Sequence, residues 1–274
     1  MKLAVAGGPA GVDAYVYTGG KAFDPALPAI AFVHGAMHDH SVWTLLARWF
    51  ANHGHAVLAP DLPGHGRSGG APLASVEAIA DWLLALLSAA GVARAVLVGH
   101  SMGSLVALEA AARAPERAAA LVLVGTAYPM AVSPALLEAG RDAPLAAIDR
   151  VNVFSHSTLA GKPSFPGPGM WLHGSNLALM LRIQAAGGPG NVFLNDFEAC
   201  NRYASGLEAA AKVTCAATCI VGGSDQMTRS DGSDELARAL KARTVVLPAG
   251  HSLMSEAPDA LLAALRGVLD VAPA

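Results

Sequence analysis

Short apolar runs and helix-like patterns take turns along the first half of the chain. The apolar runs are typical of strands buried on both faces, and the segments between them repeat apolar positions every three or four residues. After an edge strand at 12–17, the pattern predicts strands at 30–33, 57–59, 95–98 and 120–124 and helices at 42–52, 76–89 and 101–112. Strict alternation of this kind indicates an α/β fold, with a parallel sheet covered by helices.

The alternation stops after Thr126 and resumes near residue 218. The intervening segment carries seven prolines between 129 and 189 and predicts only helical pieces, at 134–139 and 176–184. Beyond it, the pattern predicts strands at 218–221 and 244–247 and helices at 233–242 and 258–269. A helical segment of roughly 75 residues is therefore inserted between two strands of one sheet.

This insertion sets the expected domain organisation. Loops that follow the carboxyl ends of parallel strands form the crevice in which ligands bind. We therefore expect residues 1–128 and 206–274 to form one α/β core, and residues 129–205 to form a helical cap, or lid, over that crevice.

The chain is apolar enough, at 53% hydrophobic and 14% charged residues, that membrane segments must be considered. The uncharged stretch 118–137 is long enough to span a bilayer, but Gly125, Pro129 and Pro134 interrupt it, and its first part fits a buried strand better. Residues 1–6 are too few for the apolar region of a signal peptide. We expect no association with membranes.

The charge and the cysteine content limit the classes of partner and the cellular compartment that we expect for this protein. The net charge is −3 and no run of lysine or arginine occurs, which argues against a nucleic-acid partner. Cys200, Cys215 and Cys219 form no Cys-x-x-Cys pair, and an odd number fits free thiols in a reducing compartment. We expect a cytoplasmic monomer or homodimer that acts on a small molecule.

The pattern Gly-x-Ser-x-Gly occurs twice, at 66–70 and 99–103. The first copy follows no apolar run and precedes no helical pattern, so Ser68 is expected in a loop. The second copy joins a predicted strand to a predicted helix. A serine in such a tight turn has a strained backbone, and side chains two residues away would collide with the strand and the helix. Ser101 is therefore the predicted nucleophile.

A serine hydroxyl needs a base to take its proton, and the base needs a carboxylate to fix its tautomer. Among ten histidines, His251 directly follows the last predicted strand, at the same carboxyl edge as Ser101. Asp225 follows the preceding strand, whereas Asp231 and Asp234 suit the first turn of a helix. The order Ser101, Asp225, His251 is the one expected for this architecture.

The developing oxyanion needs hydrogen-bond donors that are already in place. The amide of Met102, at the start of the helix after the nucleophile, is one candidate. The second is expected in the loop after the strand at 30–33, where Gly35 allows the Ala36 amide to point inward. Ala36 is our prediction, and Met37 is its nearest competitor.

Together with their flanking residues, these candidates resemble the α/β-hydrolase fold family, and the resemblance extends over essentially the whole chain. The resemblance is carried by His34-Gly35, by Asp61-Leu62-Pro63-Gly64-His65-Gly66-Arg67-Ser68, by Gly99-His100-Ser101-Met102-Gly103, by Asp225 and by Gly250-His251. It implies a mostly parallel eight-stranded sheet, a cap after the sixth strand, a Ser101–His251–Asp225 triad and an oxyanion hole from Ala36 and Met102.

Within that family, the chain looks similar to lidded bacterial carboxylesterases, lactonases and carbon–carbon bond hydrolases. Relatives that open epoxides or remove halides use aspartate where Ser101 stands. We therefore expect a serine hydrolase that cleaves a carboxylic ester or lactone of a small, largely apolar substrate. Carbon–carbon bond hydrolysis, acyl transfer and perhydrolysis use the same triad, and a receptor-like module with vestigial hydrolysis is the alternative from another class.

A metal site is a further alternative. Ligand-type side chains cluster after the first central strand, at His34, His38, Asp39 and His40. Zinc hydrolases use a His-x-His-x-Asp-His ligand set, but Gly35 and Met37 stand where two of those histidines belong. We expect neither a metal nor another cofactor.

The sequence also offers candidate residues for the substrate pocket. Its candidate residues follow the predicted strands or lie in the cap: His34, Met37, Tyr128, Phe154, Met170 and Trp171. Their side chains are mostly apolar or aromatic, which favours a substrate with an apolar acyl or alcohol group.

Overall fold

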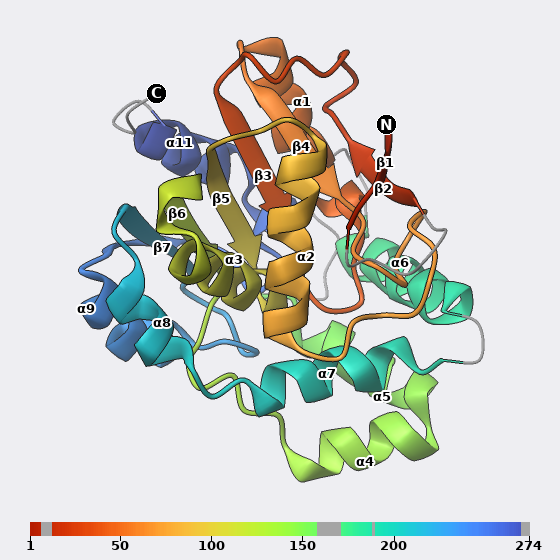
Figure 1. Cartoon of the computed structure of the whole chain (residues 1–274). Helices are drawn as coiled ribbons and strands as arrows, with labels where there is room; N and C mark the ends of the chain where they lie inside the picture. The colour runs from red at the N-terminus through yellow and green to blue at the C-terminus, as the bar shows by residue number, and fades with distance from the viewer. Residues whose placement is uncertain (7–12, 158–170, 188–189, 270–274) are drawn as a thin grey trace.

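A twisted eight-stranded sheet forms the centre of the molecule (Figure 1). The structure, a computed structural model, describes residues 1–6, 13–157, 171–187 and 190–269. The strand order is β1-β2-β4-β3-β5-β6-β7-β8, in which β1 (Lys2–Ala4) and β2 (Asp13–Tyr17) pair antiparallel, β2 pairs antiparallel with β4, and the remaining pairs are parallel. The predicted α/β architecture is confirmed.

The parallel strands lie where the apolar runs predicted them: β3 (Ala29–Val33), β4 (Ala56–Pro60), β5 (Ala95–His100), β6 (Ala118–Val124), β7 (Ala216–Gly222) and β8 (Arg243–Leu247). Every residue of β3, β4 and β5 is buried, because helices cover both faces of the sheet there. Strand β1 was not predicted, since three residues at the edge of a sheet carry no periodic signal.

Two apolar cores separate the sheet from its helices. On one face pack α2 (Val76–Ala89), α3 (Met102–Arg113), α8 (Gly206–Lys212) and α9 (Asp234–Leu240). On the other face pack α1 (Thr44–Asn52) and α11 (Pro258–Leu269) (Figure 1). Short helical turns are η1 (His40–Trp43), η2 (Pro115–Arg117), η3 (Ser230–Ser233) and α10 (Leu253–Glu256).

Of the five described helices between β6 and β7, we call the first four the cap helices: α4 (Pro134–Asp142), α5 (Pro144–Phe154), α6 (Leu172–Ala186) and α7 (Val192–Arg202). They share a third apolar core, built on side chains such as Ile148, Ile183 and Phe193. Figure 1 shows them gathered beyond one end of the strands. Only parts of α4 and α6 were predicted, because the apolar positions of α5 and α7 do not repeat over enough turns.

The uncharged stretch 118–137 begins with β6, as its apolar run predicted, and reaches α4 only at Pro134. Across the ranges that the structure describes, no helix combines the length and the hydropathy needed to cross a bilayer.

The parallel strands bring four functional candidates to one edge. Ser101 follows β5, Asp225 follows β7, His251 follows β8 and Ala36 follows β3. Because these strands run in the same direction, their carboxyl ends meet at the edge that the cap helices adjoin.

Candidate active site

Ser101 sits in a strained turn between β5 and α3. Its backbone has φ 52° and ψ −122°, which is unusual for a residue other than glycine, and Ser101 precedes the first residue of α3. Two backbone hydrogen bonds hold the turn. The Ser101 amide donates to Val124 O at 2.9 Å, and the Ser104 amide donates to Ser101 O at 2.8 Å. This is the geometry expected for a nucleophile on a strand-to-helix turn.

The glycines two residues before and after Ser101 are required because neither position has room for a side chain. A Cβ atom at Gly99 would lie 2.0 Å from Gly103 O, and one at Gly103 would lie 2.4 Å from Val33 O. Both contacts are with backbone atoms, which cannot move aside cheaply. The Gly-x-Ser-x-Gly pattern at 99–103 therefore reflects close approach of α3 to two strands.

Asp225 and His251 form a buried pair at the same edge. His251 Nδ1 donates to Asp225 Oδ2 at 2.9 Å, and Asp225 Oδ1 accepts from the amides of Met227 and Thr228 at 2.8 and 2.9 Å. Burial alone would raise the pKa of the Asp225 carboxyl, but the facing His251 and these donors lower it below its ordinary value. The carboxylate thus fixes the tautomer in which Nε2 accepts a proton.

Ser101 and His251 line one cavity, which also reaches His100 and Gly35. Within the described ranges, no hydrogen bond joins Ser101 Oγ to His251. Catalytic hydrogen bonds are often long before substrate binds, so the absence of this hydrogen bond is compatible with a nucleophile and its base.

Thr228 is a residue of this site that the sequence did not reveal. Its Oγ1 lies 2.8 Å from Asp225 Oδ2, 3.0 Å from His251 Nδ1 and 3.0 Å from Gly125 O. The hydroxyl therefore contacts both partners of the buried pair. Its only sequence signal is its position three residues after Asp225, which is common for turn residues that bond an aspartate.

Replacing Thr228 by valine is expected to lower kcat about 3–10-fold, because the shape is kept while one net hydrogen bond to the acid–base pair is lost. The measurement is steady-state hydrolysis of a short-chain aryl ester. Thr244→Val on the exposed edge strand β8 is the matched control. Equal kcat in the two variants would contradict a positioning role for Thr228.

The loop after β3 presents the Ala36 amide to the cavity. His34 Nε2 accepts from the Leu62 amide at 3.0 Å, so its proton must sit on Nδ1, which donates to Gly35 O at 2.9 Å. Gly35 O and the Ala36 N–H belong to one trans peptide and point in opposite directions. Among the described residues nothing else accepts the Ala36 N–H, and Ala36 lines the cavity.

Met37, the competing oxyanion donor, is already engaged. Its amide donates to Asp196 Oδ2 at 2.9 Å. Met102 begins α3, and the first amides of a helix have no partner within the helix. Ala36 and Met102 therefore remain the two candidate donors.

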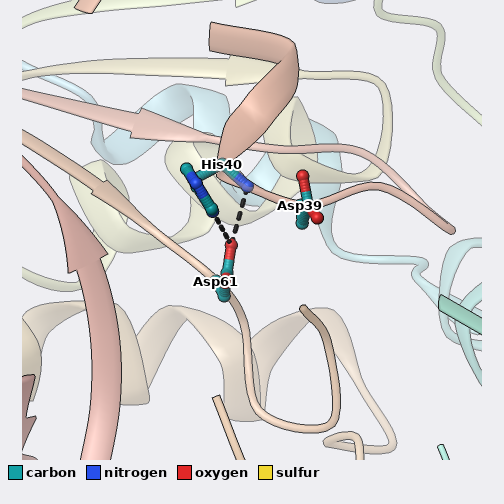
Figure 2. Close-up of side chains that lie close together, drawn as sticks. All are labelled: Asp39, His40 and Asp61. Carbon is teal, nitrogen blue, oxygen red and sulfur yellow. Dashed lines mark hydrogen bonds and ion pairs between the residues drawn. The ribbon is translucent and has the colours of Figure 1, made fainter. Parts of the chain in front are cut away.

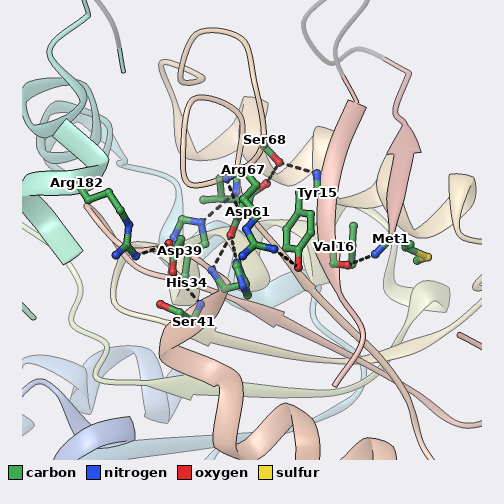
Figure 3. A network of polar contacts seen from close by, with 12 residues as sticks. Met1, Tyr15, Val16, His34, Asp39, Ser41, Asp61, Arg67, Ser68 and Arg182 are labelled. Carbon is green, nitrogen blue, oxygen red and sulfur yellow. Dashed lines mark hydrogen bonds and ion pairs between the residues drawn. The ribbon is translucent and has the colours of Figure 1, made fainter. Parts of the chain in front are cut away.

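Ser68, in the other copy of the serine pattern, is structural. Its hydroxyl is buried, donates to Asp61 O at 2.7 Å and accepts from the Tyr15 amide at 2.8 Å. Figure 3 shows it within a polar network that joins β2 to the loop after β4. Ser68 thus lies in a loop, as predicted from its context.

Asp39, His40 and Asp61 lie close enough to bind an ion together (Figure 2). Their atoms already have partners, however: Asp61 Oδ1 accepts from the His40 amide and from His40 Nδ1, at 2.7 and 2.6 Å. Asp61 Oδ2 accepts from the Arg67 amide at 2.7 Å. Asp39 accepts from the Ser41 amide and pairs with Arg182. The group is better explained as an anchor for two loops than as a metal site.

The cavity that contains Ser101 has a volume of about 280 Å³. Apolar side chains make up most of its lining, and most of these come from the cap segment: Met130, Val132, Leu136, Val151, Phe154, Met180 and Phe197. Phe154, a predicted pocket residue, is therefore in the lining, while Met170 lies outside the described residues. Such a site fits a small, largely apolar group.

Four other predicted pocket residues are absent from the described lining. His34 is fully buried between Gly35 and Leu62, and Met37 packs into the core of the cap helices. The Tyr128 ring lies against Gly206, where an added Cβ would meet it at 2.4 Å. Trp171 is 55% exposed, with its ring beside His173. Sequence position placed these residues near the crevice, but none of the four lines the described cavity.

The loop that carries His251 is tied to the cap segment. The Ser252 amide donates to Ser155 O at 2.9 Å, and Glu256 accepts from the amides of Gly250 and Ser157 at 3.1 and 3.0 Å. The segment that follows α5 is thus bonded directly to Ser252 and, through Glu256, to Gly250 on the other side of the candidate base.

Several buried histidines near the site are neutral. Burial lowers the pKa of His34 to about 4 and that of His38 to about 3, and it also lowers the pKa of His100 well below the ordinary value. These rings bind protons in the unfolded chain at a pH where the folded protein leaves them neutral.

Stability is therefore expected to fall as the pH falls below 6.5, because the unfolded state then binds more protons. For His34 alone, the difference between 6.5 and about 4 corresponds to roughly 3 kcal/mol. Urea unfolding at pH 7, 6.5, 6 and 5.5 measures the change, above the range in which most carboxylates titrate. An unfolding free energy that is constant over this range would contradict the neutral buried histidines.

The chain is similar to proteins of known family. The model of the alpha/beta hydrolase family matches residues 30–264. The curated relatives include lipase LipV of Mycobacterium tuberculosis, 39% identical over 106 residues, which are 38% of this chain and 40% of the lipase. The first curated relatives are matched over only 26–40% of their own length.

Two further similarities extend over most of the chain. Esterase Rv0045c of Mycobacterium tuberculosis is 28% identical over 89% of this chain and 83% of its own length. The solved structure of an esterase from Exiguobacterium antarcticum superimposes with a TM-score of 0.82, over 98% of this chain and 99% of the esterase, at 14% identity. Because the family match covers most of the chain, with the Ser101 turn and the Asp225–His251 pair inside it, the chain belongs to the alpha/beta hydrolase family.

Proposed function

We propose that this protein is a serine hydrolase that cleaves a carboxylic ester or lactone through an acyl-enzyme on Ser101. The observation that carries the proposal is the strained Ser101 turn in one cavity with His251, whose Nδ1 is held by Asp225. Family membership and esterase-named relatives support the same reaction class.

In the proposed reaction, Ser101 Oγ attacks the ester carbonyl while His251 Nε2 takes the hydroxyl proton. The negative charge on the carbonyl oxygen is stabilised by the amides of Ala36 and Met102. His251 then gives the proton to the leaving alcohol, and the same cycle with water as nucleophile releases the carboxylic acid. Asp225 remains ionised throughout and stabilises the imidazolium.

The substrate class follows from the cavity. A volume of about 280 Å³ and a mostly apolar lining favour a short or compact acyl group over a long chain. We propose that residues 129–205 act as the cap that closes over this group, with Phe154 and Met180 among its contacts.

The test is a turnover panel of aryl esters of increasing acyl length, together with five- and six-membered lactones. We expect the highest kcat/KM for a short or compact acyl group, with a decline once the acyl chain exceeds the cavity. Absence of turnover for every ester and lactone would contradict the proposal. Faster acyl transfer to an added alcohol than to water, or cleavage of a carbon–carbon bond instead, would reassign the main reaction to those alternatives.

We also infer a cytoplasmic location from cysteine chemistry. Cys200, Cys215 and Cys219 are free thiols in the structure, and free thiols persist in reducing compartments.

A further inference from the structure

A buried carboxylate on a cap helix reaches into the core beneath it. Asp196 lies on α7 and is 1% exposed. Its Oδ2 accepts from the Met37 amide and from His65 Nε2, both at 2.9 Å, and its Oδ1 accepts from Asn195 Nδ2 at 3.3 Å. One side chain of the cap thus bonds to the loop after β3 and to the loop after β4.

His65 balances the charge of this carboxylate. It is also buried, and its Nδ1 lies 3.0 Å from Pro63 O while its Nε2 faces Asp196. Both neighbours are acceptors, so both ring nitrogens must carry a proton, and the ring is an imidazolium. Asp196 is therefore an ionised acceptor, which makes its hydrogen bond to the Met37 amide a strong one.

The Met37 amide bears on the oxyanion site because it belongs to the peptide that directly follows Ala36. Met37 has φ 61°, the left-handed region that residues other than glycine avoid, so an added interaction is needed to hold it. The peptide before Ala36 is held by the bond from His34 to Gly35 O. The peptide after Ala36 is held by Asp196. The Ala36 N–H stands between these two fixed points.

We propose that Asp196 is a positioning residue of the active site, which aims the Ala36 N–H at the oxyanion by holding the Met37 amide. The inference rests on the proposed serine hydrolase function, in which Ala36 supplies one of two donors. In this proposal the cap has a second role besides covering the substrate. Asp196 on α7 supports the loop after β3 through Met37, which lies 159 residues earlier in the chain.

Two substitutions separate the hydrogen bond from the rest of the side chain. Asp196→Ala removes the acceptor for the Met37 amide. Asp196→Asn keeps an oxygen at the Oδ2 position, which accepts from both the Met37 amide and His65 Nε2, while its NH₂ group takes the Oδ1 position. Glu198→Gln is the matched control, since Glu198 lies on the same helix but pairs with Arg141 and Arg202 at the surface.

The experiment measures kcat and KM of the full-length protein with a short-chain aryl ester, normalised to the serine that a fluorophosphonate titrates. Normalisation removes any unfolded fraction, which a merely structural role would increase. We expect Asp196→Ala to lower kcat about 10–10²-fold with KM changed less than about 3-fold, because the oxyanion contact acts in the transition state. Asp196→Asn is expected to stay within about 3-fold of the wild type, and Glu198→Gln to equal it.

A second variant covers the case in which Asp196→Ala leaves His65 too poorly packed to fold. The pair Asp196→Leu and His65→Leu replaces both charges by apolar side chains, and it should show the same loss of kcat per titrated serine. Wild-type kcat in these variants, or a loss that falls on KM alone, would overturn the role of Asp196. Activity retained by Ser101→Ala would instead overturn the proposed function, and with it this inference.

Discussion

Ser101→Ala is expected to lower kcat by about 10⁴–10⁶-fold, because it removes the hydroxyl of the strained strand-to-helix turn that lines the cavity together with His251. The backbone of the turn is held by the bond to Val124 and by the glycines at 99 and 103, so the variant should fold normally. The measurement is steady-state hydrolysis of the best ester from the panel, with thermal unfolding as a check of the fold.

Ser68→Ala is the matched control for this prediction. It removes the serine of the other Gly-x-Ser-x-Gly copy, whose hydroxyl bonds, within the described residues, to Asp61 O and the Tyr15 amide. We expect a loss of stability of about 1–3 kcal/mol and an unchanged kcat for the folded protein. A larger loss of kcat in Ser68→Ala than in Ser101→Ala would show that the nucleophile has been assigned to the wrong copy.

Asp225→Asn is expected to lower kcat about 10³–10⁴-fold while preserving the fold. The amides of Met227 and Thr228 both donate to Asp225 Oδ1, so an asparagine would place its oxygen there and its NH₂ group at the position of Oδ2. That NH₂ group would donate to His251 Nδ1 and move the ring proton to Nε2. The base would then be in the wrong tautomer to accept the proton of Ser101.

The control for this tautomer argument is Asp231→Asn, in the exposed pair with Arg229 at the start of η3. It should keep wild-type kcat. The pH dependence of kcat/KM should be recorded for both variants, because the tautomer effect persists at every pH at which the protein is folded. Near wild-type activity of Asp225→Asn at any pH would show that another carboxylate orients His251.

The sequence was sufficient to predict the sheet and to place the three candidate catalytic residues at one edge of it, because each has a local signal; their catalytic roles stay predictions. Buried parallel strands appear as short apolar runs, and Ser101, Asp225 and His251 each follow one of them at its carboxyl end. Their chain order and the strand direction then bring them to one edge without any knowledge of side-chain packing.

The cap and the supports of the site could not be predicted in this way. Hydrogen bonds join Asp196 to Met37, 159 positions away, and to His65, 131 positions away. No local sequence pattern predicts contacts between residues so far apart. His34 and Met37 were predicted to line the pocket because they flank the oxyanion loop. The structure instead turns His34 toward Leu62 and Met37 toward the core of the cap helices, where each supports the loop from outside the cavity.

The neutral histidines beside the site and the charged His65 show why burial alone does not determine protonation. His34 faces one donor and one acceptor, so a single ring proton satisfies both of its nitrogens. His65 faces two acceptors, and its pKa is raised because Asp196 and Pro63 O outweigh the effect of burial. The partners of each ring therefore decide its charge.

The most direct test of the serine mechanism is to label the wild-type protein with a fluorophosphonate and to map the modified residue by mass spectrometry. We expect one phosphonyl group per chain, on Ser101, with loss of ester hydrolysis in proportion to labelling. A label on any other residue, or full labelling of Ser101 with activity retained, would contradict it.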